Sequence, residues 1–291
     1  MKFGLHLPHI GQFATREDVL ATAQLLDQEG FESVWVADHV AMPVRSESVY
    51  PYRADGFPFP KDAAWLEAIT TAAFVAGVTT RVQLGFSVLV LPMRHPVLTA
   101  KMLATLDHLS NGRVVVGLGV GWWREEFAAL GVPFAERGRR CDEAIEVLRG
   151  LWREKEFSYK GRFYEFEAVY CEPKPIRRSI PLWIGGGEAG FERIVRLGDG
   201  WHAVGGDVEK IAAGWANIIR RAEKAGRDPA SLELTVSTGL ASDRSRTISR
   251  FRALWKAGVS HIVLNTRQLP FPQLREVVER FARDWRPEIE G

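Results

Sequence analysis

The sequence predicts a (β/α)8 TIM barrel, formed by a single domain over residues 1–291, with insertions after strands 2 and 4. Short apolar runs alternate with amphipathic segments along the whole chain. Eight such strand–helix units fit within 291 residues. No linker or change of composition marks a second domain. A doubly wound open sheet would give the same alternation, because a number of strands does not establish closure.

The first four units follow from apolar periodicity and from signals that begin and end helices. Thr15, with Asp18 three residues later, is typical of a helix start, and Gly30 is typical of its end. Pro96 opens a later helix. The expected strands are 2–8, 33–37, 81–87 and 113–121, and the expected helices are 15–30, 65–79, 95–110 and 136–153.

The second half repeats the alternation after one irregular segment. Residues 157–175 alternate and are rich in aromatic side chains, which favours an inserted hairpin over a barrel unit. Residues 41–64 form the other long insertion. The expected strands are 181–187, 199–205, 232–240 and 260–266, with helices from about residue 188 and over 208–226, and an amphipathic segment after each of the last two strands.

Composition excludes several classes of protein. The charge is +2, with 46% hydrophobic and 25% charged residues and no long basic run, so nucleic acid is not an expected partner. The longest apolar run, 86–93, is too short to cross a membrane, and the first residues lack the apolar core of a signal peptide. Cys141 and Cys171 have no metal-ligand neighbour at short spacing, so we expect no metal and no disulfide framework. A cytoplasmic protein acting on a small-molecule substrate is the expectation.

Asp38 and His39 follow the second expected strand directly. The mouth of such a barrel, where active sites lie, is built from the ends of the strands. An acid beside an imidazole can bind a flat heterocycle or hold a proton donor near it, which makes His39 the candidate catalytic group. Histidines more often serve as satisfied structural groups, and that reading applies to the other six.

Two glycine-rich turns also follow strands. One is 117–121, which includes Gly119 and Gly121, and the other is Gly185–Gly186–Gly187. Glycine lets a phosphate approach backbone amides closely, so a phosphate-bearing ligand is the favoured interpretation. Turns that serve packing alone remain the alternative, more so for the first turn, because glycine inside a barrel strand can also serve packing.

With these motifs in order, the chain resembles the luciferase-like monooxygenase superfamily, in particular its coenzyme F420-dependent oxidoreductase branch. The resemblance spans roughly the first 200 residues. It is carried by "GFESVWVADHV", "LGFSVLVLPMRHPVLTAKMLATLDHLSNGRVVVGLGVGWWREEFAALG", "ERGRRCDEAIEVLRGLW", "PLWIGGG" and "LGDGWH". It implies a (β/α)8 barrel, commonly dimeric, with a flavin or 5-deazaflavin at the mouth and hydride chemistry at the ring centre.

The resemblance also implies roles for particular residues. Asp38 and His39 would contact the deazaflavin ring, and a cis peptide bond would join Ser87 and Val88 behind it. Gly119 and Gly121 would line the cofactor site, Gly185, Gly186 and Gly187 would contact its phosphate, and Arg137 would lie near its linker or phosphate.

One departure from the pattern affects the chemistry. Some deazaflavin-dependent dehydrogenases carry a catalytic glutamate directly after the second glycine of the strand-four turn, where this chain has Trp122. Glu125 and Glu126 lie one turn further on, and either could instead be a surface or capping acid. Cofactor binding is therefore expected, with His39 as the best proton-handling group.

Three further hypotheses stay open beside an F420-dependent oxidoreductase. These are an FMN-dependent monooxygenase supplied by a flavin or F420 reductase, a non-catalytic flavin-binding protein, and an unrelated barrel enzyme for a phosphorylated substrate. The insertion 41–64 is either a substrate lid or a plain surface loop. Its aromatic residues suggest a partly apolar substrate, whereas its basic residues suggest an anionic cofactor tail.

Overall fold

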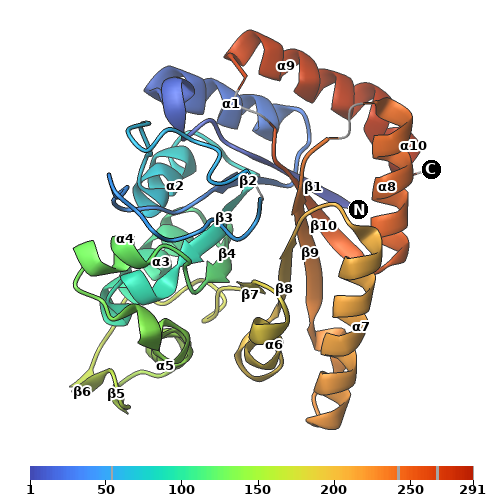
Figure 1. The fold of residues 1–291 in the computed structure, drawn as a ribbon. Helices are drawn as coiled ribbons and strands as arrows, with labels where there is room; N and C mark the ends of the chain where they lie inside the picture. The colour runs from blue at the N-terminus through green and yellow to red at the C-terminus, as the bar shows by residue number, and fades with distance from the viewer. Residues whose placement is uncertain (54, 241–242, 267–268, 291) are drawn as a thin grey trace.

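The computed structural model describes residues 1–53, 55–240, 243–266 and 269–290. Its barrel strands are β1 (Lys2–His6), β2 (Ser33–Val36), β3 (Gln83–Val90), β4 (Val114–Gly119), β7 (Leu182–Gly185), β8 (Gly200–Val204), β9 (Glu233–Thr238) and β10 (Val259–Leu264). They are parallel and follow the order β1-β10-β9-β8-β7-β4-β3-β2 around a closed barrel (Figure 1). β1 pairs with both β2 and β10, which an open sheet would not allow. The predicted (β/α)8 barrel is therefore confirmed.

Helices surround the barrel on its outside (Figure 1). The α-helices are α1 (Arg16–Gln28), α2 (Ala68–Ala76), α3 (Pro96–Leu109), α4 (Arg124–Ala129), α5 (Arg137–Arg153), α6 (Phe191–Leu197), α7 (Val208–Lys224), α8 (Arg244–Lys256), α9 (Phe271–Arg280) and α10 (Arg286–Glu290). Short 3-10 turns lie at Gly11–Phe13, Leu91–Met93, Phe134–Glu136, Glu188–Gly190 and Pro229–Ser231, and a π-helical turn at Phe281–Trp285.

Side-chain caps fix where the helices begin. Thr15 accepts a hydrogen bond from the Asp18 amide before α1, as its sequence predicts. The expected helix 65–79 is shorter, because the Glu67 carboxylate accepts from the Thr70 amide and starts α2 there. The helix expected from residue 188 begins as a 3-10 turn before α6. α4 was not expected from the sequence.

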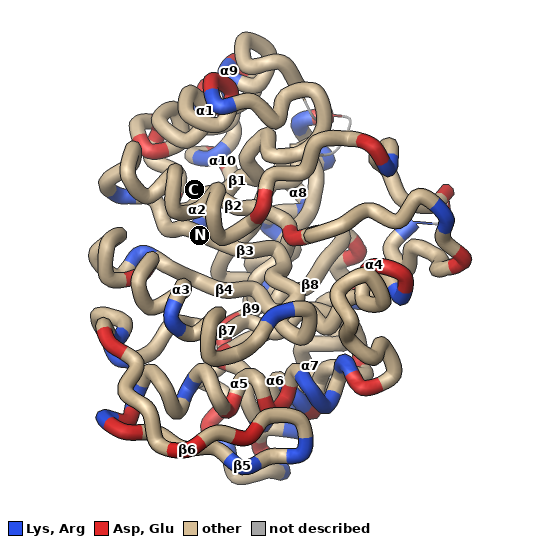
Figure 2. Tube along the Cα trace, turned by 90° about the vertical axis from the view of Figure 1, so that its left-hand side faces the viewer, with Lys and Arg blue, Asp and Glu red and all other residues tan. Residues whose placement is uncertain are grey.

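Both insertions lie where the sequence places them. The hairpin is formed by β5 (Phe157–Lys160) and β6 (Glu165–Val169), which pair antiparallel, and it lies between α5 and β7. The other insertion runs from β2 to α2, and its position 54 lies outside the described residues. Basic and acidic positions are interspersed along the outer helices and loops (Figure 2). Within the described part of the chain, no helix is both long and apolar enough to cross a membrane.

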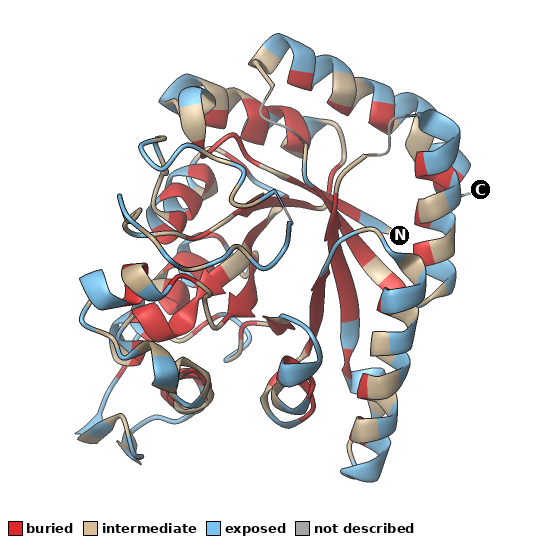
Figure 3. Ribbon diagram, viewed as in Figure 1, coloured by how far each residue is buried: buried red, intermediate tan, exposed pale blue. Residues whose placement is uncertain are grey.

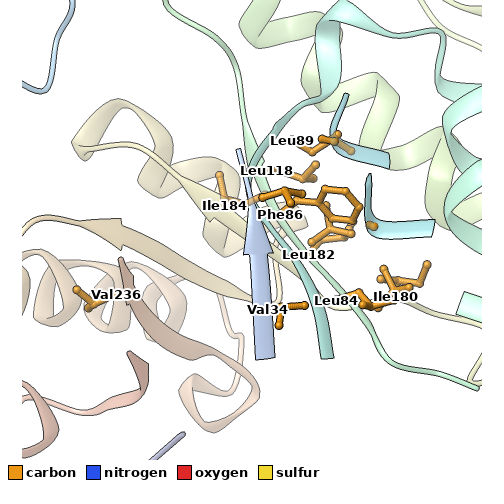
Figure 4. Packing of buried hydrophobic residues seen from close by; sticks show 14 of the residues in the cluster. Val34, Leu84, Phe86, Leu89, Leu118, Ile180, Leu182, Ile184 and Val236 are labelled. Atoms are coloured by element: carbon orange, nitrogen blue, oxygen red, sulfur yellow. The ribbon is translucent and has the colours of Figure 1, made fainter. Parts of the chain in front are cut away.

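The main core lies between the strands and the helices. The strands are buried along most of their length, and each helix is buried only on the side that faces them (Figure 3). Phe86 and Leu182 lie among aliphatic side chains of this layer (Figure 4). This packing holds the strand ends, and the loops that follow them, in fixed positions.

The Trp35 indole fills the interior of the barrel. It packs with Val115, Trp183 and Val263, and it stacks on Trp183 at 5.9 Å between ring centroids. Its space exists because Gly85 on β3 has no side chain: a Cβ there would overlap three atoms of the indole. The bore is therefore filled with side chains, as is usual for this fold.

Gly85→Ala tests this packing. The added methyl group overlaps the indole, so we expect the free energy of unfolding to fall by about 1–3 kcal/mol, the usual cost of overpacking a core. Urea unfolding measures the change. Gly77→Ala is the matched control, because a Cβ there would meet only one backbone atom at 3.6 Å. An equal loss in both variants would contradict the close fit.

Candidate active site at the barrel mouth

His39 is held in one orientation by a carboxylate that lies 87 residues away in the sequence. Its Nδ1 lies 2.7 Å from Glu126 Oε2 on α4. The second carboxylate oxygen, Oε1, accepts from the amides of Val40 and Ala41 at 2.6 and 3.2 Å. A carboxylate only accepts hydrogen bonds, so Nδ1 carries the proton in this pair. Nε2 is then the nitrogen left for a ligand, and no hydrogen bond to it is found in the described ranges.

Aromatic rings enclose the imidazole of His39. The rings of Phe57, Trp65 and Trp123 lie 5.6, 4.8 and 5.5 Å from it between centroids, all close to perpendicular. Trp122 is a fourth neighbour at 6.1 Å. The His39 side chain is 11% exposed and that of Glu126 is 2% exposed. This apolar enclosure strengthens the ion-pair character of any contact made inside it.

The Glu125 carboxylate on α4 holds the insertion 41–64, which we call the lid, beside this aromatic enclosure. Glu125 accepts from the Ser48 hydroxyl at 2.7 Å and from the Glu47 amide at 2.8 Å. Nearby, the Trp123 indole donates to Ser46 Oγ at 2.7 Å. Hydrogen bonding, chiefly from Ser48, lowers the pKa of Glu125 to about 2.

The lid contact is expected to weaken in acid. Because hydrogen bonding lowers the Glu125 pKa from 4.5 to about 2, the carboxylate stabilises the closed lid above pH 4.5 and loses this effect as the pH falls toward 2. Hydrogen exchange of lid amides between pH 2 and 6 measures the change.

Glu125→Gln should show fast lid exchange already at pH 6, with little further change in acid. Glu47→Gln is the matched control, since the Glu47 amide rather than its carboxylate meets Glu125. Lid exchange in Glu125→Gln that matches the wild type at pH 6 would contradict the role of this carboxylate.

Asp38 lies beside His39 in sequence, but its carboxylate is directed to the end of β3. Arg94 donates to both of its oxygens at 2.6 and 2.7 Å, and the Val90 amide donates at 2.8 Å. Arg94 also binds Glu67 at 3.0 Å. Burial alone would lower the pKa of Arg94, but the carboxylates of Asp38 and Glu67 outweigh burial and raise it. Asp38 thus ties β2 to the turn after β3.

Ser87 and Val88 are joined by a cis peptide bond, as the resemblance implied. Ser87 Oγ lies 2.8 Å from His202 Nε2, and His202 Nδ1 lies 2.8 Å from Thr235 Oγ1. Burial lowers the pKa of His202 to about 4, so its ring is neutral near pH 7. Thr235 donates its own proton to the Trp201 carbonyl, so His202 Nδ1 donates to Thr235 and Nε2 accepts from Ser87. Ser87 therefore presents acceptor lone pairs at its half-buried position.

The two glycine turns differ in their surroundings. A Cβ on Gly121, where φ is +79°, would lie 2.5 Å from Phe127, and one on Gly119 would strike the Val88 side chain. These glycines permit close packing. In the second turn Gly186, with φ +108°, and Gly187 are exposed and have nothing within 4 Å of an added Cβ. The second turn therefore leaves room for a ligand to approach the backbone.

Gly185 and Arg137 border these turns. A Cβ on Gly185 would lie 3.0 Å from Val88, so the second turn begins against the cis peptide. Arg137 donates to the Gly121 and Phe134 carbonyls, each at 3.1 Å, and lies over the Phe134 ring at 3.8 Å. Burial, with Arg124 nearby, lowers the pKa of Arg137. In the described ranges no carboxylate pairs with it.

The structure brings His39 together with a residue that the sequence does not connect to it. Glu126 was named only as a possible surface or capping acid, and it is instead the buried partner of His39. His202 was read as a structural histidine, and its bond to Ser87 was not foreseen. For Glu126 the available signal was an acid in the turn after β4, at the same end of the barrel as His39.

Comparison with known proteins gives one family. The family model described as luciferase-like monooxygenase matches residues 1–286. An uncharacterized protein of Mycobacterium tuberculosis is 34% identical over 248 residues, covering 84% of this chain and 83% of that protein. An F420-dependent glucose-6-phosphate dehydrogenase of Amycolatopsis mediterranei is 32% identical over 243 residues, covering 80% and 67%.

A shorter match and a solved structure extend the comparison. An FMNH(2)-dependent dimethylsulfone monooxygenase of Pseudomonas fluorescens is 40% identical over 121 residues, covering 40% of this chain and 33% of that protein. The structure of an F420-dependent secondary alcohol dehydrogenase, solved with an F420–acetone adduct, matches with a TM-score of 0.79 and 20% identity. This match covers 99% of this chain and 98% of that chain. At that identity the likeness concerns the fold.

Proposed function

The chain belongs to the luciferase-like monooxygenase family, and on that premise we propose that it is an oxidoreductase that transfers a hydride between coenzyme F420 and a small organic substrate at the barrel mouth. Relatives in the family include both F420-dependent and FMN-dependent enzymes. When bound, the deazaflavin supplies a ring carbon that gives or accepts the hydride. The protein supplies binding, orientation and proton handling.

The observation that carries this proposal is the state of His39. Glu126 holds Nδ1 in its protonated form, so Nε2 is the atom that takes a proton from a ligand or returns one to it. The aromatic enclosure excludes water from this transfer. Glu126 is a positioning residue, because it touches His39 rather than the ligand.

The remaining predicted residues fit a planar ring with a phosphate-bearing chain. The open glycines Gly186 and Gly187, preceded by Gly185, leave space for a phosphate, and Arg137 offers a cation without a carboxylate partner among the described residues. Ser87 and Val88 would face the ring, with Gly119 and Gly121 behind them. We include Asp38 in the proposed cofactor site because its carboxylate anchors the turn after β3.

An FMN-dependent monooxygenase is the second candidate, supported by the family description and by the dimethylsulfone monooxygenase among the relatives. It would need a partner that supplies reduced flavin. A flavin-binding protein without turnover would have no use for the fixed tautomer of His39, which favours the enzyme. Assembly as a homodimer remains a proposal from the family resemblance.

The test is a pair of binding titrations with purified protein, one with F420 and one with FMN, followed by cofactor fluorescence. Tight F420 binding with weak FMN binding supports the proposal. The reverse preference supports the monooxygenase. Binding of neither cofactor would contradict both candidates.

A further inference from the structure

Arg250 is a cation at the mouth that has no counter-ion in the described part of the chain. It lies on α8 and is half-buried, and no carboxylate within salt-bridge distance is found for it in the described ranges. Its Nη2 donates to the Gly239 carbonyl just after β9, and its Nε is buried without any hydrogen-bond partner. Leaving a buried donor unsatisfied is unfavourable, so this position favours an acceptor from outside the chain. Burial, with no anion to offset it, lowers the pKa of Arg250.

The surroundings of the guanidinium are shaped by small residues and a hydroxyl. A Cβ on Gly206 would lie 2.9 Å from Arg250 Nη1 and 3.2 Å from Thr238 Oγ1. The guanidinium and the hydroxyl therefore both lie next to the face of Gly206 where a side chain would stand. Gly205 before it, with φ +112°, is exposed and has nothing within 4 Å of an added Cβ. The loop that follows β8 therefore places bare backbone, rather than side chains, beside the guanidinium and the hydroxyl.

The position of this cluster relates it to His39. Gly205 and Gly206 follow β8, and Thr238 ends β9. In the strand order, β8 is four strands from β2 in either direction, so it is directly opposite the strand that His39 follows. The chain leaves β8 over the end of the barrel at which β9 also finishes (Figure 1). The loop after β8 and the end of β9, which Arg250 contacts, therefore lie across the barrel from the strand that His39 follows.

From these contacts we propose that Arg250 and Thr238 bind a carboxylate or phosphate group of the substrate, opposite His39. Arginine suits such groups because its planar donors match their oxygens. Placing the substrate on this side of the mouth rests on the proposed function, whereas the anion site itself does not. The substrate class is then a small organic anion whose charged group lies across the mouth from its reacting atom.

The first test observes the site directly by the nuclear magnetic resonance signal of the Arg250 Nε–H, assigned by its loss in Arg250→Lys. Inorganic phosphate and acetate are titrated separately at constant ionic strength. A saturable shift of this signal by either anion is expected. Arg252, exposed on the same helix, is the internal control and should shift little. If the Arg250 signal moves no more than that of Arg252, the proposal is overturned.

The second test identifies the source of the anion with Arg250→Gln and the matched control Arg252→Gln. If the substrate supplies the anion, Arg250→Gln abolishes the rise in Tm that phosphate or acetate gives and leaves the Kd for F420 within twofold. The same Kd is also measured for the deazaflavin chromophore without its phosphate. A tenfold or larger rise in the Kd for F420, with no rise for this chromophore, would overturn the assignment to the substrate and give the site to the cofactor. Anion binding at Arg250 without binding of F420 or FMN would uphold the anion site and defeat the proposed function.

Discussion

His39→Ala is expected to lower kcat by about 10²–10⁴-fold, the range over which a positioned acid or base contributes. The substitution removes the one ring nitrogen that Glu126 leaves free for a ligand. It should also weaken F420 binding by about 1.5–3 kcal/mol if Nε2 bonds the ring. The Kd comes from cofactor fluorescence, and kcat comes from turnover with the best substrate of an anion screen.

The control for this prediction separates chemistry from structure. Glu126→Gln preserves the size of the partner and can still accept the Val40 and Ala41 amides through its carbonyl oxygen. The NH2 group of the glutamine then faces Nδ1 and donates to it, which places the imidazole proton on Nε2, so kcat should fall while the Tm changes little. A His39→Ala variant with unchanged kcat and Kd would remove this histidine from the mechanism, even if the protein is less stable.

Asp38→Asn is expected to lower the free energy of unfolding by about 3–5 kcal/mol, the cost of breaking a buried ion pair from one side. Arg94 is left largely buried with only Glu67 as its carboxylate partner. Its contacts to residue 38, at 2.6 and 2.7 Å in the wild type, then meet a neutral amide instead of a carboxylate. The retained Glu67 contact places the loss toward the lower end. Urea unfolding monitored by tryptophan fluorescence measures it.

Two comparisons make the Asp38 result decisive. Glu17→Gln, in the exposed pair Arg16–Glu17, should leave stability unchanged. A loss for Asp38→Asn as small as for this control would show that the buried pair contributes little. The F420 affinity, measured where the variant is folded, then tests the proposed ring contact: a weaker affinity supports it, and an unchanged affinity limits Asp38 to holding Arg94 and the Val90 amide.

The barrel could be predicted because its signals are local. Thr15 with Asp18 marks a helix start within four residues, and apolar runs such as 33–36 mark strands by themselves. The end of each strand is then known, so the neighbourhood of His39 and the glycine turns follows from the fold. The hairpin after α5 was also readable, because its alternation is unlike a barrel unit.

The partners within the site could not be predicted from the same signals. His39 meets Glu126, Asp38 meets Arg94, and Ser87 meets His202 across 87, 56 and 115 positions. Such pairs depend on how elements far apart in the sequence meet once the barrel has closed, and on the rotamers of their side chains. Residue type alone does not select among several acids at one rim. Glu125 and Glu126 illustrate this, because neighbouring acids hold different segments.

The double use of the Glu126 carboxylate has a kinetic consequence. One oxygen orients His39, and the other holds the first two amides after it, where the lid begins. Lifting this segment to admit a ligand therefore also releases the imidazole, and only reclosure restores its orientation. A molecule too bulky for the lid to close over it would still bind, but the His39 imidazole beside it would stay misaligned for proton transfer. Discrimination by size should then appear in turnover number rather than in affinity.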